Sequence, residues 1–204
     1  MTFKYFKYPE RFGAYLEGEV VCDCCKKTKK CFDGELFYGE KTITAICGDC
    51  LLAGELKPLE IYTNDADGQG LVNQLAELYP NKSAEEILKE ARQKTDIVEM
   101  QTPSILSWQD WKFPAIDGDY GEFLGFASKR DYIRVSKSLG IEDASAFFKS
   151  TLHPDWKGHI NLDLLWEQVP KKYIKELKGS NHDVIFYLFK STSAENYLTI
   201  WDTN

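Results

Sequence analysis

The residues best suited to chemistry lie in one short stretch near the start of this chain. All six cysteines of the 204-residue sequence fall between positions 22 and 50. Two residues separate Cys22 from Cys25, and two separate Cys47 from Cys50. A C-x-x-C turn places two thiolates on one side of a metal, and two such turns supply the four soft ligands that Zn²⁺ prefers. The spacing therefore predicts one structural zinc ion per chain, held by Cys22, Cys25, Cys47 and Cys50.

Two cysteines exceed the needs of a four-ligand site. Cys24 could replace Cys22 or Cys25, although only the 22/25 pair has the knuckle spacing. Cys31 has the character of a small buried apolar residue. We expect neither Cys24 nor Cys31 to be a ligand, but the substitution of one of them for a predicted ligand stays open. A disulfide pair and an iron–sulfur cluster are the chemical alternatives to zinc.

A site closed by four cysteines leaves no coordination position for water or a substrate. Catalytic motifs are also missing, because the sequence has no G-x-S-x-G, no glycine-rich phosphate loop and no H-E-x-x-H. No serine or cysteine forms a nucleophile motif with any of the histidines, which are His153, His159 and His182. The acidic pair Asp117 and Asp119 fits a surface loop. We expect a protein that is not an enzyme, with no catalytic residue and no small-molecule substrate.

The segment between the two cysteine pairs has to form a connection that brings them together. Residues 31–37 and 41–46 have strand-like composition, and Tyr38-Gly39-Glu40 can form a turn between them. Two C-x-x-C turns joined by a hairpin are the plan of a zinc ribbon. The aromatic-rich residues 1–20 are expected to form a lead-in strand and loop that cover this module. We assign residues 1–60 to a zinc-ribbon-like module.

Residues 61–204 alternate helical and strand-like patterns and form the second predicted domain. Helical spacing ends before Pro80, and the Ser83/Glu86 and Ser128/Asp131 pairs are capping boxes that begin further helices, the first with Ile87, Leu88 and Ala91 facing inward. The remaining expectations are helices at 71–78, 143–151, 161–168 and 170–177, a loop at 152–158, and a closing hairpin of 184–189 with 197–201. The predicted fold is α+β: a zinc-ribbon-like module followed by a mixed helix/strand domain with a C-terminal β-hairpin.

The charge of the chain limits its partners. The formal net charge is −7, which argues against a general nucleic-acid binder and suits a basic protein partner. The longest apolar run, Val184 to Phe189, is far shorter than the roughly 18 residues of a membrane helix. The first ten residues lack the apolar core of a signal peptide. We therefore expect a cytoplasmic protein without membrane association.

Four lysines beside the first cysteine pair favour an alternative function. Lys26, Lys27, Lys29 and Lys30 would offset the charge of a four-thiolate zinc site, and they could also form a small basic patch. This alternative is a zinc-ribbon regulator that contacts nucleic acid or the transcription machinery.

Several segments together resemble the CbrC family of bacterial proteins linked to colicin tolerance. The resemblance covers most of the chain and rests on these segments: Phe6-Lys7-Tyr8-Pro9, Cys22 to Cys25, Cys47 to Gly54, Thr102-Pro103, Trp108-Gln109, Phe123-Leu124-Gly125, Tyr187 to Lys190, Tyr197 and Trp201-Asp202. It implies immunity or tolerance to a bacteriocin or contact-delivered toxin. The acidic charge of the chain then predicts that it acts by protein–protein binding, with a basic toxin domain as the partner.

The chain departs from the family pattern at two places. Family members carry a His/Cys group before the F-L-G segment, where this chain has Ile116, Asp117 and Gly121. They also carry a C-x-x-C in the closing hairpin, where this chain has Ser191 and Ala194. The resemblance therefore implies that a second metal site is not kept here.

Overall fold

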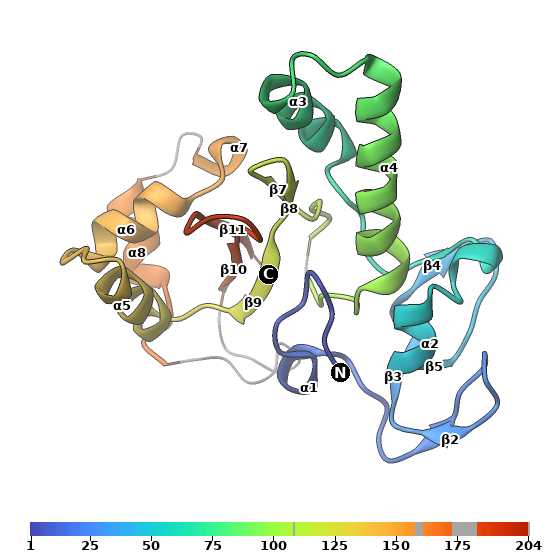
Figure 1. The fold of residues 1–204 in the computed structure, drawn as a ribbon. Helices are drawn as coiled ribbons and strands as arrows, with labels where there is room; N and C mark the ends of the chain where they lie inside the picture. Colours follow the sequence, from blue (N-terminus) through green and yellow to red (C-terminus); the bar gives the residue numbers. More distant parts are fainter. Residues whose placement is uncertain (108, 158–160, 173–182, 204) are drawn as a thin grey trace.

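The computed structural model describes residues 1–107, 109–157, 161–172 and 183–203, which form a mixed helix and strand fold (Figure 1). In chain order the elements are α1 (Pro9–Phe12), β1 (Val20–Val21), β2 (Thr28–Lys29), β3 (Cys31–Asp33), η1 (Gly34–Leu36), β4 (Tyr38–Gly39), β5 (Ala45–Cys47), α2 (Gly48–Ala53), η2 (Lys57–Leu59), β6 (Ile61–Tyr62), α3 (Gly68–Leu78), α4 (Ala84–Gln101), β7 (Ala115–Ile116), β8 (Asp119–Tyr120), β9 (Glu122–Phe126), α5 (Lys129–Ser138), α6 (Ala144–Thr151), α7 (Pro154–Lys157), α8 (Leu162–Gln168), β10 (Val184–Lys190) and β11 (Tyr197–Thr203). No helix in these ranges is both long enough and apolar enough to cross a membrane.

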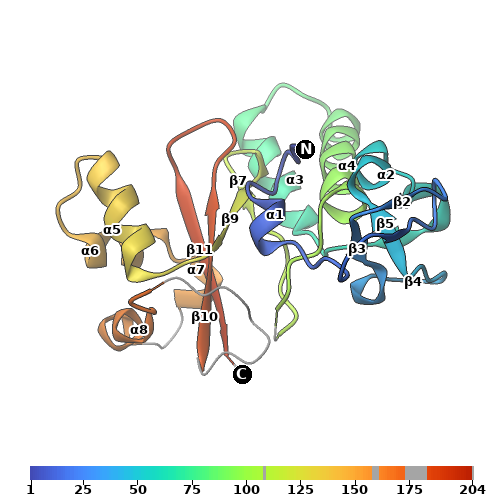
Figure 2. The same ribbon diagram turned by 90° about the horizontal axis from the view of Figure 1, so that it is seen from below.

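The predicted C-terminal hairpin is confirmed and belongs to a three-stranded antiparallel sheet of order β11-β10-β9. Strands β10 and β11 pair from Val184↔Thr203 to Lys190↔Tyr197. Strand β9 pairs with the other edge of β10. The sheet lies between helices α5, α6 and α8 on one side and α3, α4 and the cysteine module on the other (Figures 1 and 2).

Strand β10 is buried along almost its whole length because each of its faces belongs to a different core. Ile185, Tyr187 and Phe189 join an extended core that reaches the cysteine module. Phe186 and Leu188, which alternate with them, join the core formed with α5, α6 and α8. This two-sided burial explains the continuous apolar run, which is typical of a strand with both faces covered. The extended core contains residues from both sides of position 60. The division into two domains at that position stays a prediction.

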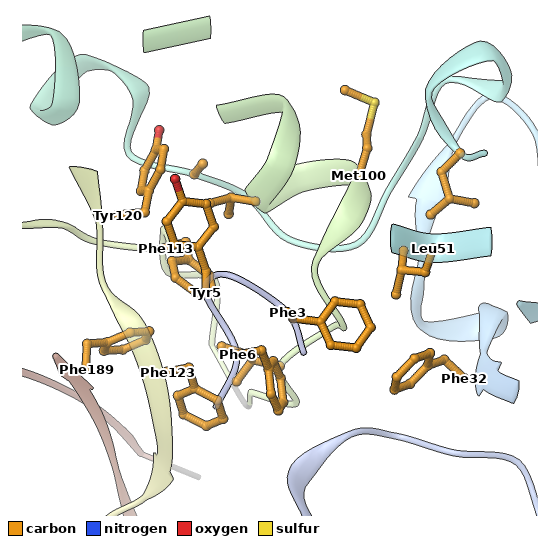
Figure 3. Close-up of a cluster of buried hydrophobic side chains, with 14 of the residues drawn as sticks. Phe3, Tyr5, Phe6, Phe32, Leu51, Met100, Phe113, Tyr120, Phe123 and Phe189 are labelled. Carbon is orange, nitrogen blue, oxygen red and sulfur yellow. The ribbon is translucent and has the colours of Figure 1, made fainter. Parts of the chain in front are cut away.

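The N-terminal segment, which is expected to cover the cysteine module, contacts both that module and the sheet. Phe3 packs edge-to-face on Phe32 of β3, with ring centroids 5.9 Å apart. Phe6 packs in the same way on Phe123 of β9, at 5.1 Å. Figure 3 shows this row of buried rings running from the sheet, through the N-terminal segment, to the module. We call residues 3–12 the N-terminal strap.

The connection between the cysteine pairs differs from the predicted hairpin. Strand β3 pairs with β5, but each strand has only three residues. Asp33 ends β3, because its carboxylate accepts a hydrogen bond from the N–H of Glu35 at 3.0 Å and starts a 3₁₀ turn. The predicted turn at Tyr38-Gly39-Glu40 is wrong, since Tyr38 and Gly39 form β4, which pairs with β6.

The helices largely follow the expected patterns. Both capping boxes are present, at the starts of α4 and α5, and α6 and α8 lie where helical spacing placed them. Leu88 was predicted to face inward but is 57% exposed, while Ile87 and Ala91 are buried as expected. The loop expected at 152–158 contains the short helix α7, which has Pro154 at its first position. The helix predicted from Pro170 falls mainly on residues 173–182, which lie outside the described residues.

A buried polar junction holds the C-terminal end of α4. The Asn64 side-chain amide donates to the carbonyls of Val98 and Thr102 at 3.2 and 3.3 Å. Its Oδ1 accepts from the N–H of Ile105 at 3.1 Å. The Thr63 hydroxyl donates to the carbonyl of Thr102 at 2.6 Å. These two side chains satisfy carbonyls that the end of a helix leaves without partners, and they fix the chain that follows α4.

We predict that Asn64→Ala lowers the free energy of unfolding by about 2–3 kcal/mol, because it leaves buried carbonyls and an N–H without partners. Asn64→Asp should cost more at pH 7, since it places a carboxylate against carbonyl oxygens. Chemical denaturation at pH 7 measures both values. Exposed Asn73→Ala is the matched control, with an expected change under about 0.5 kcal/mol. An Asn64→Asp protein as stable as Asn64→Ala would contradict the assigned amide geometry.

Candidate metal centre

The structure brings four of the six cysteines together, and they are the four that the spacing singled out. The Sγ atoms of Cys22, Cys25, Cys47 and Cys50 all lie within 4.8 Å of one another. A tetrahedral ion with bonds of about 2.3 Å to sulfur requires sulfur–sulfur edges of about 3.8 Å. The Cys25 and Cys47 sulfurs are 3.8 Å apart, which matches such an edge. The four cysteines can therefore hold a metal ion.

The distance between the Cys25 and Cys47 sulfurs fits metal ligation and is too long for a disulfide bond. A disulfide bond brings two sulfurs to about 2.05 Å, and all six cysteines are free thiols in the structure. Three of the four clustered cysteines are buried, and Cys25 is half-buried. The group is thus a compact, largely enclosed set of four sulfur donors.

The two cysteine pairs are held by different local structures. Cys22 and Cys25 lie in a tight turn between β1 and β2, which the Lys26 N–H closes by donating to the Cys22 carbonyl at 2.9 Å. Lys26 then adopts a left-handed conformation with φ of 60°. Cys47 ends β5 and caps α2, and Cys50 lies in the first turn of that helix. Helix α2 begins at Gly48 and ends at Ala53, with Gly54 in a left-handed conformation at its C-cap.

The thiol of Cys22 has a lowered pKa and therefore ionises readily. Burial raises its pKa, but backbone N–H groups of Cys47, Cys25 and Cys24 lower it more, to about 6. The Cys47 N–H donates to the Cys22 sulfur at 3.3 Å. Burial and the neighbouring sulfurs raise the pKa of Cys50, because a further negative charge in this cluster is costly without a cation. A bound cation would remove that cost.

Cys24 and Cys31 lie close to the cluster but do not belong to it. Burial, followed by the charge of Cys22, raises the pKa of each of them to about 11, so both remain thiols at neutral pH. Cys31 is fully buried and pairs with Cys47 across the β3–β5 ladder, which fits its expected role as a small core residue. The Cys31 sulfur contacts the carbonyl of Val20 at 3.8 Å.

Asp23 ties the first cysteine turn to the strand that carries the second pair. Its carboxylate accepts hydrogen bonds from the N–H groups of Thr44 and Ala45 at 2.7 and 3.0 Å, and from the Thr44 hydroxyl at 3.0 Å. These bonds hold the pKa of Asp23 below its usual value, with the Ala45 N–H as the largest cause. The aspartate therefore positions the ligands, a role that the sequence alone did not reveal.

Two of the four lysines beside the first pair make contacts within the module. Lys29 makes an ion pair with Asp49 at 2.5 Å. The Lys30 ammonium lies over the ring of Tyr15, 4.0 Å from its centroid. Lys26 and Lys27 are exposed in the turn. Half of the predicted basic group is thus engaged within the module.

The positions that depart from the CbrC pattern lie together at the turn of the C-terminal hairpin. The Asn196 amide donates to Asp117 at 2.9 and 3.0 Å. The Ser191 hydroxyl accepts from the N–H of Ala194 at 3.2 Å. A Cβ on Gly121 would lie only 2.7 Å from a carbon of Ile116. Hydrogen bonds and apolar contacts thus fill the region around this hairpin turn.

Asp119, half of the acidic pair noted in the sequence, ties the N-terminal strap to β8. Its carboxylate accepts from the hydroxyl of Tyr5 at 2.6 Å and from the ammonium of Lys4 at 2.9 Å. Burial raises its pKa, but these two bonds lower it more, so it remains ionised. Asp117 is bonded to Asn196 instead, so the two carboxylates serve separate contacts.

In a comparison with known protein families, the model of a family described as Uncharacterised protein family (UPF0167) matches residues 1–203. Neither the curated proteins nor the solved structures contain a match to the chain.

We predict that Asp23→Ala lowers the free energy of unfolding by about 2 kcal/mol, because two backbone N–H groups lose their acceptor. The matched control is Asp49→Ala, which removes a carboxylate that is 68% exposed and should cost less than about 1 kcal/mol. Thermal and urea unfolding of the two variants measure the difference. Equal losses in both would rule out the positioning role of Asp23.

Proposed function

Because the chain belongs to UPF0167, an uncharacterised protein family, we propose a function from its own site: a zinc-stabilised binding protein without enzymatic activity. The observation that carries the proposal is the convergence of four cysteine sulfurs within 4.8 Å. Four sulfur donors favour Zn²⁺ over harder cations such as Mg²⁺ or Ca²⁺. Bound there, zinc would supply four bonds between the first turn and the start of α2.

The donor set supports a structural role for this zinc. With Cys22, Cys25, Cys47 and Cys50 as ligands, the tetrahedral coordination is complete and no position is left for a substrate. Energy from metal binding then contributes to folding of the module, because the unfolded chain has no preformed site. Metal binding by these cysteines would therefore stabilise the surface around β4, β5 and α2.

Binding to a basic partner follows from charge and from the resemblance to the CbrC family. The net charge of −7 favours association with a positively charged protein through complementary surfaces. The resemblance points to immunity or tolerance to a bacteriocin or a contact-delivered toxin. We infer that the protein neutralises a basic toxin domain by covering the surface with which that domain contacts its target.

Elemental analysis of the purified protein should find about one zinc per chain. Cys22→Ser and Cys47→Ser should each lose the metal and lower the thermal midpoint by several degrees, because a three-thiolate site holds zinc less tightly. Cys24→Ser is the matched control and should keep both the metal and the midpoint. A fully folded protein that contains no metal would contradict the zinc assignment.

Co-expression with toxin domains encoded beside its gene should restore growth, and the same pair should co-purify at physiological salt. Cys24→Ser should preserve rescue, while Cys22→Ser should weaken it in proportion to the loss of folded protein. Absence of binding and rescue with every neighbouring toxin domain would remove the immunity function. It would leave the zinc assignment intact, since that has a separate measurement.

A further inference from the structure

A groove of about 670 Å³ lies between the cysteine module and the segment that follows α4. Tyr38 of β4 lines one side, and Ile105 and Trp111 line the other. Its floor includes Asn64, which the junction at the end of α4 holds in place. A volume of this size is typical of sites that receive a ligand or an anchoring side chain.

The charged groups of this groove are all acidic within the described part of its wall. Asp65 and Asp110 line it, and no lysine or arginine does. Nearby, burial and then the charge of Asp65 raise the pKa of Glu99 to about 7. The groove thus has an excess of negative charge that its own wall does not neutralise.

A hydroxyl in the wall is also within reach of a ligand. Ser104 lines the groove and is only 9% exposed. Its oxygen is not among the buried side-chain atoms that lack a partner in the described ranges, so water can reach it from the groove. A donor group that enters the groove could donate to this hydroxyl in place of water.

Two aromatic rings provide flat surfaces beside these polar groups. Tyr38 stacks on Tyr62, with centroids 5.6 Å apart, and its hydroxyl donates to the carbonyl of Asn64 at 2.8 Å. Trp111 packs against Tyr187 of β10 at 4.9 Å. Because neighbouring contacts hold both rings, little side-chain freedom is lost when a flat cation stacks on them.

We propose that this groove receives an arginine side chain of the basic protein partner. A guanidinium group is flat, permanently charged and rich in donors, so it can stack on Tyr38 or Trp111 while it donates to Asp65, Asp110 and Ser104. The apolar stem of the arginine would lie along Ile105. The proposal rests on the proposed function, since it names the chemistry by which that partner is bound.

The test measures binding of an acetylated, amidated tetra-arginine peptide by calorimetry at low salt. The peptide should bind, and tetra-citrulline, which has the same shape without the charge, should not. Asp65→Asn combined with Asp110→Asn should raise the Kd at least tenfold. Glu17→Gln combined with Glu142→Gln removes the same number of charges from exposed positions outside the groove and should change the Kd less than twofold.

Ser104→Val tests the hydroxyl separately and should weaken binding several-fold, with the thermal midpoint recorded for every variant. Equal weakening by the two acidic double variants would show that net charge alone binds the peptide and would overturn the proposal. Unchanged binding by Asp65→Asn/Asp110→Asn in a folded protein would also overturn it.

Growth rescue separates this proposal from the proposed function. Binding of tetra-arginine in the groove by a wild-type protein that rescues growth from no toxin would contradict the immunity function. The same result would support arginine binding by the groove. If rescue succeeds and survives Asp65→Asn/Asp110→Asn unchanged, the function stands and the groove is not where that partner binds.

Discussion

The closure of the cysteine module depends on one electrostatic constraint: four sulfur atoms that can carry charge lie within 4.8 Å of one another. Without a cation, each ionised thiol makes ionisation of the next more costly. Burial and the neighbouring sulfurs raise the pKa of Cys50, while backbone N–H groups lower the pKa of Cys22. With a cation, the same closeness becomes favourable. A bound cation would therefore stabilise the arrangement in which the fold holds these four cysteines.

This local constraint extends across the molecule through aromatic packing. The N-terminal strap places Phe3 on the module and Phe6 on the sheet, so the two regions share a continuous core. The Asn64 junction makes a second link, since it joins the chain leaving the module to the end of α4. Buried contacts consequently fix both sides of the surface between the module and the sheet.

The cysteine spacing, the capping boxes and the closing hairpin were predictable because each depends on residues close in sequence. The spacing of Cys22 and Cys25 and the Ser83/Glu86 pair are of this kind. The pairing of β4 with β6 was not predictable, because two-residue strands have no periodicity and their partners are chosen by packing. The dual contacts of the N-terminal strap and the role of Asp23 likewise depend on residues distant in sequence. Leu88 followed a helical pattern, yet the elements that pack on α4, chiefly α3, decide which of its faces is covered.

Strand β10 has a consequence for how the chain is made. It forms a wall of both hydrophobic cores, through Tyr187 on one face and Phe186 on the other. During synthesis on the ribosome, neither core can be completed until residues 184–190 have emerged, although the cysteine module lies more than a hundred residues earlier. The nascent chain must then keep aromatic side chains such as Phe6 and Phe123 exposed for most of its synthesis. Chaperone demand and aggregation during translation should therefore be governed by the arrival of one late strand.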